Sequence, residues 1–238
     1  MIGNYFDQKS LKRKNEALVR ENEKVEAAQS GMDAAQEQVQ DLASQLQRLN
    51  IDLVQTWLKS LSNNFGLDTN DRITVYYEYG RAFFLLARYS KNPEFRRVHR
   101  QKFPIDEGVI SQAWQHEECV ETECPEANEH QAYEDFLVEK YGYKREKPHS
   151  FNMKSCRLYA KAIIDAGDNI GVIVFESISD KFLENLDIKN LRMHCEAQQS
   201  QLAKFVRDGL RYDKEITLLA SARTTSVESE LLSGESDE

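Results

Sequence analysis

The stretch that decides the fold is KSCRLYAKAIIDAGDNIGVIVFES, from Lys154 to Ser177. It contains two runs rich in apolar and β-branched residues, 156–164 and 170–177, which favour β-strands. The segment between them, DAGDN, is rich in Gly, Asp and Asn, the residues that tight turns prefer. The stretch therefore predicts a β-hairpin.

A second hairpin is predicted upstream. The runs ITVYYEY (residues 73–79) and AFFLLARYS (residues 82–90) are separated only by Gly80 and Arg81, and a two-residue connection containing Gly is typical of a tight hairpin. After the second hairpin, apolar residues at three-and-four spacing predict one long final helix with Cys195 in its core stripe. These residues are Leu191, Cys195, Leu202, Phe205, Tyr212 and Ile216.

The order of these elements resembles a GAF domain. A helix, a hairpin, the segment FPIDEGVISQAW (residues 103–114), a helical excursion, the second hairpin and a final helix follow one another over residues 51–216. The resemblance implies an α/β (α+β) fold, with an antiparallel sheet flanked by helices and a small-molecule pocket roofed by the central segment. The second glycine of the family's short-helix motif is replaced at Ser111 or Gln112. The charged signature of cyclic-nucleotide-binding members has no counterpart, so the sequence does not indicate a cyclic nucleotide.

The N-terminal part carries a seven-residue apolar repeat. Such a repeat stays on one face only when helices supercoil together, so we expect a coiled coil and a parallel homodimer. The alternative is a single amphipathic helix that lies on its own domain. The seam residues are Leu11, Leu18, Val25, Met32, Val39, Leu46 and Leu53, with Leu42 and Leu49 on the companion seam.

We expect three parts: a coiled-coil helix (residues 1–50), the GAF-like domain with its entering and exiting helices (residues 51–216), and an acidic tail (residues 217–238). The tail is rich in Ser, Thr and Glu and nearly free of aromatic residues, which predicts disorder.

Aromatic residues around the central segment are candidates for the pocket wall: Phe103, Trp114, Tyr133, Phe136, Phe151 and Met153. The alternative for most of them is an amphipathic helix packed on the sheet. Arg157 and Tyr159 share a strand face with Lys161. This face is expected either beneath the roof, where it would suit an anionic ligand, or in solvent, or paired with Glu176 across the hairpin.

The free methionine sulfoxide reductases are GAF proteins with reactive thiols near the pocket, and this chain has four cysteines. Cys119 and Cys124 lie in the corresponding region, but their spacing and neighbours do not match that family's motif. We therefore expect ordinary thiols and no catalytic residue. Without a CxxC pair, neither a structural zinc site nor a disulfide framework is predicted, and the cysteine usage favours a reducing compartment.

Charge and composition bound the function. The net charge of −9 disfavours nucleic-acid binding, although Arg96, Arg97 and Arg100 form a basic stretch that would suit an acidic partner or remain in solvent. The sequence has no signal-peptide core or apolar run long enough to cross a membrane, so a cytoplasmic protein is expected. No kinase, P-loop or hydrolase motif is present. We thus expect a non-catalytic sensor that signals to a separate effector protein through a dimeric coil. The alternatives are a structural adaptor with an empty GAF-like dimerisation module and a thiol-dependent methionine sulfoxide reductase. The sequence names no ligand or cofactor.

Overall fold

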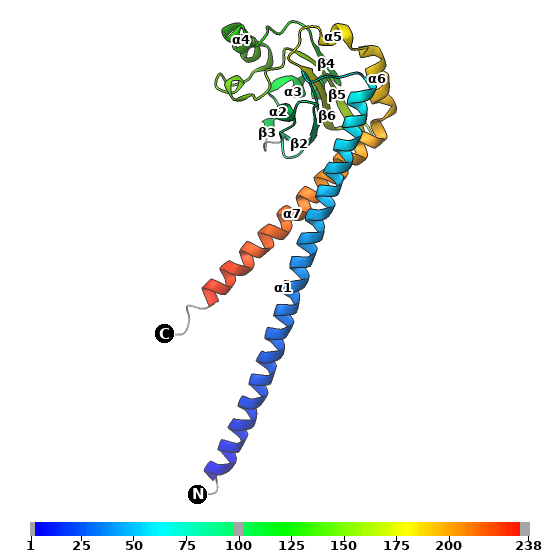
Figure 1. Cartoon of the computed structure of the whole chain (residues 1–238). Helices are drawn as coiled ribbons and strands as arrows, with labels where there is room; N and C mark the ends of the chain where they lie inside the picture. Colours follow the sequence, from blue (N-terminus) through cyan, green and yellow to red (C-terminus); the bar gives the residue numbers. More distant parts are fainter. Residues whose placement is uncertain (1–2, 98–101, 234–238) are drawn as a thin grey trace. The chain divides into compact units, whose positions relative to one another are not determined.

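The computed structural model describes residues 3–97 and 102–233 (Figure 1). Its contacts define a folded unit, Leu46–Lys214, and a second unit made of the residues up to Gln45 and those from Glu215 onward. Two long helices take part in both units: α1 spans Gly3–Asn64 and α7 spans Gln199–Ser233.

The folded unit is built on one six-stranded sheet in the order β3-β2-β1-β6-β5-β4. Every neighbouring pair of strands is antiparallel. The strands are β1 (Asp71–Glu78), β2 (Ala82–Tyr89), β3 (Lys102–Pro104), β4 (Glu118–Glu121), β5 (Arg157–Asp165) and β6 (Asp168–Ser177).

Both predicted hairpins are present, and each closes through two residues of positive φ. Gly80 and Arg81 have φ of 57° and 62°, and Ala166 and Gly167 have φ of 52° and 94°. Positive φ at both turn residues matches the right-handed twist of the flanking strands, which is why Gly recurs there. The second turn is shorter than the predicted five residues because β5 and β6 stay paired as far as Asp165 and Asp168.

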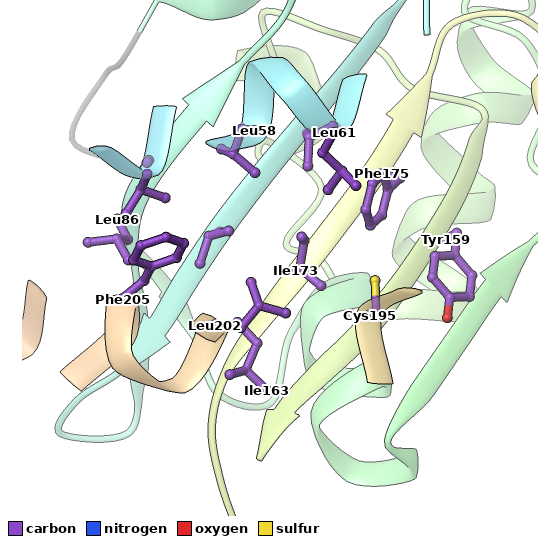
Figure 2. Packing of buried hydrophobic residues seen from close by; sticks show 14 of the residues in the cluster. Leu58, Leu61, Leu86, Tyr159, Ile163, Ile173, Phe175, Cys195, Leu202 and Phe205 are labelled. Atoms are coloured by element: carbon purple, nitrogen blue, oxygen red, sulfur yellow. The ribbon is translucent and has the colours of Figure 1, made fainter. Parts of the chain in front are cut away.

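Helices cover both faces of the sheet, as the resemblance implied (Figure 1). One face packs against α3 (Gly108–His116) and α4 (His130–Tyr141). The other packs against the end of α1, against α5 (Phe182–Asn185) and α6 (Ile188–Ala197), and against the start of α7. Figure 2 shows this second core, in which Leu58 and Leu61 of α1 meet Ile173 and Phe175 of β6. The remaining short helices are α2 (Pro93–Arg96) and the 3-10 helix η1 (Pro148–Ser150).

The predicted final helix is two helices, α6 and α7, that meet at Gln198. The Gln199 side chain donates to the carbonyl of Ala162 and accepts from the amide of Ile164, both at 3.0 Å. The register of β5 and β6 shifts between Ile163 and Ile164, next to these contacts. The break between α6 and α7 thus allows the Gln199 side chain to hydrogen-bond to backbone groups of β5 beside this register shift. Cys195 is fully buried, as predicted.

The predicted disordered tail needs correction. Residues 217–233 continue α7, and residues 234–238 lie outside the described residues. Composition was a poor guide here because the segment has no Gly or Pro before Gly234. Without these residues the helix has no strong local stop.

The α1 helix carries apolar residues on two faces near the folded unit. Val54, Leu58 and Leu61 are buried in the core. Leu49 and Leu53, from the predicted coiled-coil seam, are 65% and 56% exposed. The predicted seam is thus separate from the face that packs on the sheet. Among the described residues, no helix combines the length and the apolar character that crossing a membrane requires.

Candidate ligand cavity

A cavity of about 70 Å³ lies between the sheet and the layer that contains α3 and α4. This volume exceeds what one water molecule needs and is well below that of pockets for drug-sized ligands. Its apolar wall consists of Phe103, Val109, Ile110, Leu137, Phe151, Met153, Leu158 and Val174. Its polar wall consists of Arg72, Tyr76, Tyr133, Tyr143, Asn152, Ser155 and Glu176.

The floor of the cavity holds a buried ion pair. Arg72 on β1 and Glu176 on β6 are directly opposite in the register, and Arg72 Nε donates to Glu176 Oε1 at 2.7 Å. Both side chains are only 9% exposed. The second carboxylate oxygen of Glu176 accepts from Ser155 Oγ at 2.7 Å. A charged pair is costly to bury, so its position at this cavity is informative.

The environment shifts the pKa of both charged groups. Burial alone would raise the pKa of Glu176, but the Arg72 guanidinium, with smaller effects of the Arg88 charge and the Ser155 hydroxyl, outweighs it and holds the pKa below its usual range. Burial alone would lower the pKa of Arg72, and the Glu176 carboxylate reverses that effect and raises it. The pair is therefore ionised in the folded protein.

Buried tyrosines complete the polar wall. Tyr76 accepts from Arg88 Nη2 at 3.4 Å, and Tyr133 donates to the carbonyl of Ser155 at 3.3 Å. Burial raises the pKa of Tyr76, Tyr133 and Tyr143, so all three are neutral donors at neutral pH.

The roof is closed by the segment after α4. Gly142 ends α4 in the left-handed conformation, with φ of 68°. Tyr143 then lies over Gly108 so closely that a Cβ on Gly108 would be 2.1 Å from its hydroxyl. A side chain at position 108 would clash with Tyr143, so the start of α3 requires glycine there. Asn152 fixes the far end of the roof by donating to the carbonyl of Glu94 at 2.9 Å.

Four of the predicted wall residues line this cavity: Phe103, Tyr133, Phe151 and Met153. Trp114 and Phe136 do not. The Trp114 ring packs on Phe83 with centroids 5.4 Å apart, and its carbonyl accepts from Asn169. Phe136 lies beside Tyr141 and under Lys140. For these two, the alternative of helix packing is the better description.

The predicted placement of Arg157 and Tyr159 beneath the roof is wrong. Their strand face points to the opposite layer, where Tyr159 is fully buried in the core of Figure 2. Arg157 donates to the carbonyls of Cys124 and Asp180, and Lys161 pairs with Glu196 of α6 at 3.2 Å. This face is covered by helices, and Glu176 pairs with Arg72 instead of Arg157.

Sequence reasoning missed Arg72, Tyr76, Ser155 and Glu176. A signal was available, because in DRITVYYEY the residues Arg72, Thr74 and Tyr76 alternate with the more apolar Ile73 and Val75. Polar residues at every second position of a buried strand mark a face with its own polar environment.

The thiols lie outside the cavity wall. Cys119 is half-buried, and Cys124 and Cys156 are buried. Burial raises the pKa of all three, that of Cys124 to about 12, which disfavours the reactive thiolate. Among the residues whose side chains the structure describes, 11–97 and 102–218, no group of three or more His, Cys, Asp or Glu is placed to hold a metal ion.

The expected sheet, both hairpins, the helical layers and the position of the cavity now agree with the family resemblance. The fold is GAF-like. No protein-family model matches the chain, and no curated protein sequence matches it.

Solved structures with a similar arrangement include GAF domains. The GAF domain of an Acinetobacter phosphoenolpyruvate-protein phosphotransferase has 12% identity and a TM-score of 0.44, with 75% of this chain and 97% of that chain covered. The A. aeolicus nlh2 GAF domain in an inactive state has 15% identity and a TM-score of 0.36, with coverage of 79% and 99%. A type II free methionine-R-sulfoxide reductase from Thermoplasma acidophilum has 12% identity and a TM-score of 0.46, with coverage of 68% and 96%.

A second polar cluster lies on the helix side of the GAF-like unit. Tyr77 of β1 donates its hydroxyl to Asp213 of α7, and Gln47 of α1 donates to the other carboxylate oxygen of Asp213. Tyr77 is 4% exposed. One carboxylate therefore joins the sheet to both long helices.

Proposed function

We propose that this chain is a non-catalytic sensory protein whose GAF-like unit binds a small molecule in the Arg72–Glu176 cavity and relays binding to α1 and α7. A coiled-coil homodimer would then pass the signal to a separate effector protein. The observation that carries the proposal is the position of β1, which borders both the cavity and the Asp213 cluster.

Adjacent residues of β1 face opposite sides of the sheet. Tyr76 lines the cavity, and Tyr77 donates to Asp213 on the opposite face of the sheet. The register with β2 shifts between Val75 and Tyr76, and such an irregularity re-aims the side chains next to it. A ligand that moves Tyr76 would therefore move Tyr77, and through Asp213 it would bias α1 and α7. This is a route by which a ligand can favour one of two helix arrangements.

The homodimer is supported by the exposed seam on α1. Leu42, Leu49 and Leu53 are more than half exposed, although the same helix buries another apolar stripe on its own sheet. The rest of the predicted seam is also exposed: Leu11, Leu18, Val25, Met32, Val39 and Leu46. Pairing with a second α1 in parallel would remove this apolar surface from water.

An effector surface is proposed at the basic segment after β2. Arg96 and Arg97 are exposed, and Arg97 forms an ion pair with Glu94 at 2.9 Å. Arg100 lies outside the described residues. An acidic protein surface would suit the local positive charge of this segment, whereas the overall negative charge disfavours nucleic-acid binding.

The relay is tested by hydrogen exchange of α1 and α7 in freshly purified protein, before and after a retained ligand is removed. Native mass spectrometry verifies that a ligand is present and then absent. We expect ligand removal to change exchange in both helices of the wild type but not of Tyr77→Phe, which keeps the cavity and loses the bond to Asp213. Tyr89→Phe, which removes one hydroxyl from the neighbouring strand, should behave like the wild type.

Equal responses in Tyr77→Phe and the wild type would reject the relay. A dimer that retains no small molecule, together with a stable partner in pull-down experiments, would instead support the adaptor function.

A further inference from the structure

We propose that the cavity binds a small carboxylate, with its negative end on Arg72 and its short apolar end against the aromatic wall. This inference rests on the proposed function, because it names the ligand class of the same cavity.

The guanidinium of Arg72 has unused donors. Its Nε donates to Glu176, but neither Nη1 nor Nη2 hydrogen-bonds to any of the described residues. The side chain is nine-tenths buried, so water does not freely replace those partners. The planar edge of the guanidinium presents these donors in a geometry that matches two carboxylate oxygens.

The hydroxyl of Tyr76 adds a donor at the same wall. Because its oxygen accepts from Arg88 Nη2, its own hydrogen points elsewhere and is available to a ligand. The strongest acceptor is already engaged: Glu176 accepts from Arg72 at one oxygen and from Ser155 at the other. The Arg72 guanidinium and the Tyr76 hydroxyl thus offer donors, while both oxygens of Glu176 already accept hydrogen bonds, which favours an anion over an amine.

The walls limit the ligand's size. Phe103, Tyr133 and Phe151 border a space of only about 70 Å³, and Tyr143, which packs against Gly108, also lines it. A carboxylate with a short aliphatic chain accepts from these donors. Its aliphatic part is small enough for the cavity and leaves water on binding.

Three probes of nearly equal size test the charge preference: propionate, propionamide and propylammonium. Each is titrated into the full-length protein by calorimetry and thermal shift, after retained small molecules are removed and at constant ionic strength. We expect propionate to bind at least about tenfold more tightly than the other two, since only it accepts at two oxygens.

Three variants locate the binding. Arg72→Lys should weaken propionate by about tenfold or more, because an ammonium lacks the planar fork. Glu176→Gln should strengthen it by about tenfold, because it removes a nearby negative charge. Arg192→Lys, on an arginine that pairs with Glu118 outside the cavity, is the control and should leave affinity unchanged. Far-UV circular dichroism establishes that each variant is folded; if Arg72→Lys is not, Glu176→Gln decides alone.

Tighter propionate binding in Glu176→Gln would support the proposal, and weaker or equal binding would overturn it. If the amide or the amine binds and the carboxylate does not, the anion preference is wrong while the cavity remains a ligand site. If no probe binds and native mass spectrometry finds no retained molecule, both the preference and the sensory function are rejected.

Discussion

The buried pair at the cavity floor makes a prediction about stability that needs no ligand. Replacing Arg72 with Met removes the partner of a carboxylate whose side chain is only 9% exposed. Breaking such a pair from one side costs about 3–5 kcal/mol, because the remaining charge stays buried without compensation. We expect Arg72→Met to lose about that much unfolding free energy at pH 7.

The pH dependence of this stability loss shows whether the buried Glu176 carboxylate causes it. In the wild type the pKa of Glu176 is held below its usual range, so its stabilising contribution is present above the unfolded pKa of 4.5 and is lost as pH falls through the folded value. In Arg72→Met the largest influence that opposes burial is lost, and only the smaller ones of Arg88 and Ser155 remain against it. We therefore expect burial to raise the pKa of Glu176 above 4.5, which reverses the sign. The penalty is then relieved as pH falls toward the unfolded pKa, by up to about 1.4 kcal/mol per pH unit.

Urea unfolding, followed by tryptophan fluorescence at pH 7 and pH 5, measures both effects. The difference between Arg72→Met and the wild type should narrow by as much as about 2.7 kcal/mol between these pH values. The double variant Arg72→Met with Glu176→Gln should recover most of the loss, because no uncompensated charge stays buried. Arg192→Met breaks an ion pair of higher exposure and should cost about 1 kcal/mol or less. If Arg72→Met costs no more than Arg192→Met, or its penalty does not depend on pH, the description of the cavity floor is wrong.

Two further predictions concern the seam and the sheet. Leu42→Lys with Leu49→Lys should convert the proposed dimer to monomer in light scattering, whereas the exposed control Gln45→Lys should not; a variant that remains fully dimeric contradicts the seam. Gly171→Ala should destabilise the protein by about 1–3 kcal/mol in urea unfolding, because its Cβ would lie 2.4 Å from the Tyr76 carbonyl oxygen on the next strand. The control Gly31→Ala meets nothing within 4 Å and should stabilise α1 by up to about 1 kcal/mol, so equal effects at the two glycines would contradict the packing around β6.

The sequence was sufficient for the sheet because the strand signals are local. A two-residue turn containing Gly80 fixes which strands pair, and the turn at Gly167 does the same for β5 and β6. The break between α6 and α7 had no such signal, since it depends on Gln199 reaching Ala162 and Ile164 on β5. Contacts between distant segments of this kind are not visible in a periodicity.

The cavity residues were predicted only in part for a related reason. Aromatic residues of the central segment suit both a cavity wall and a helix core, so Phe151 and Phe136 look alike in the sequence although only Phe151 lines the cavity. Burial of charged groups is also unexpected from composition, and Arg72 and Glu176 are more than one hundred residues apart along the chain. Only the pairing of β1 with β6 brings them together.

The placement of Arg157 and Tyr159 shows that the orientation of the two sheet faces decides which residues line the cavity. Alternation along β5 correctly divides its residues into two sets, but alternation alone does not say which set lies under the roof. The sets differ in their neighbours: Leu158 lies with Val174 and Glu176 in the cavity, and Tyr159 lies with Phe175 in the helix core. Because β1 alternates in the same way, the assignment that places Arg72 in the cavity also places Tyr77 on Asp213. The proposed ligand site and the proposed relay therefore depend on a single choice of sheet face, and an experiment that locates either residue tests both.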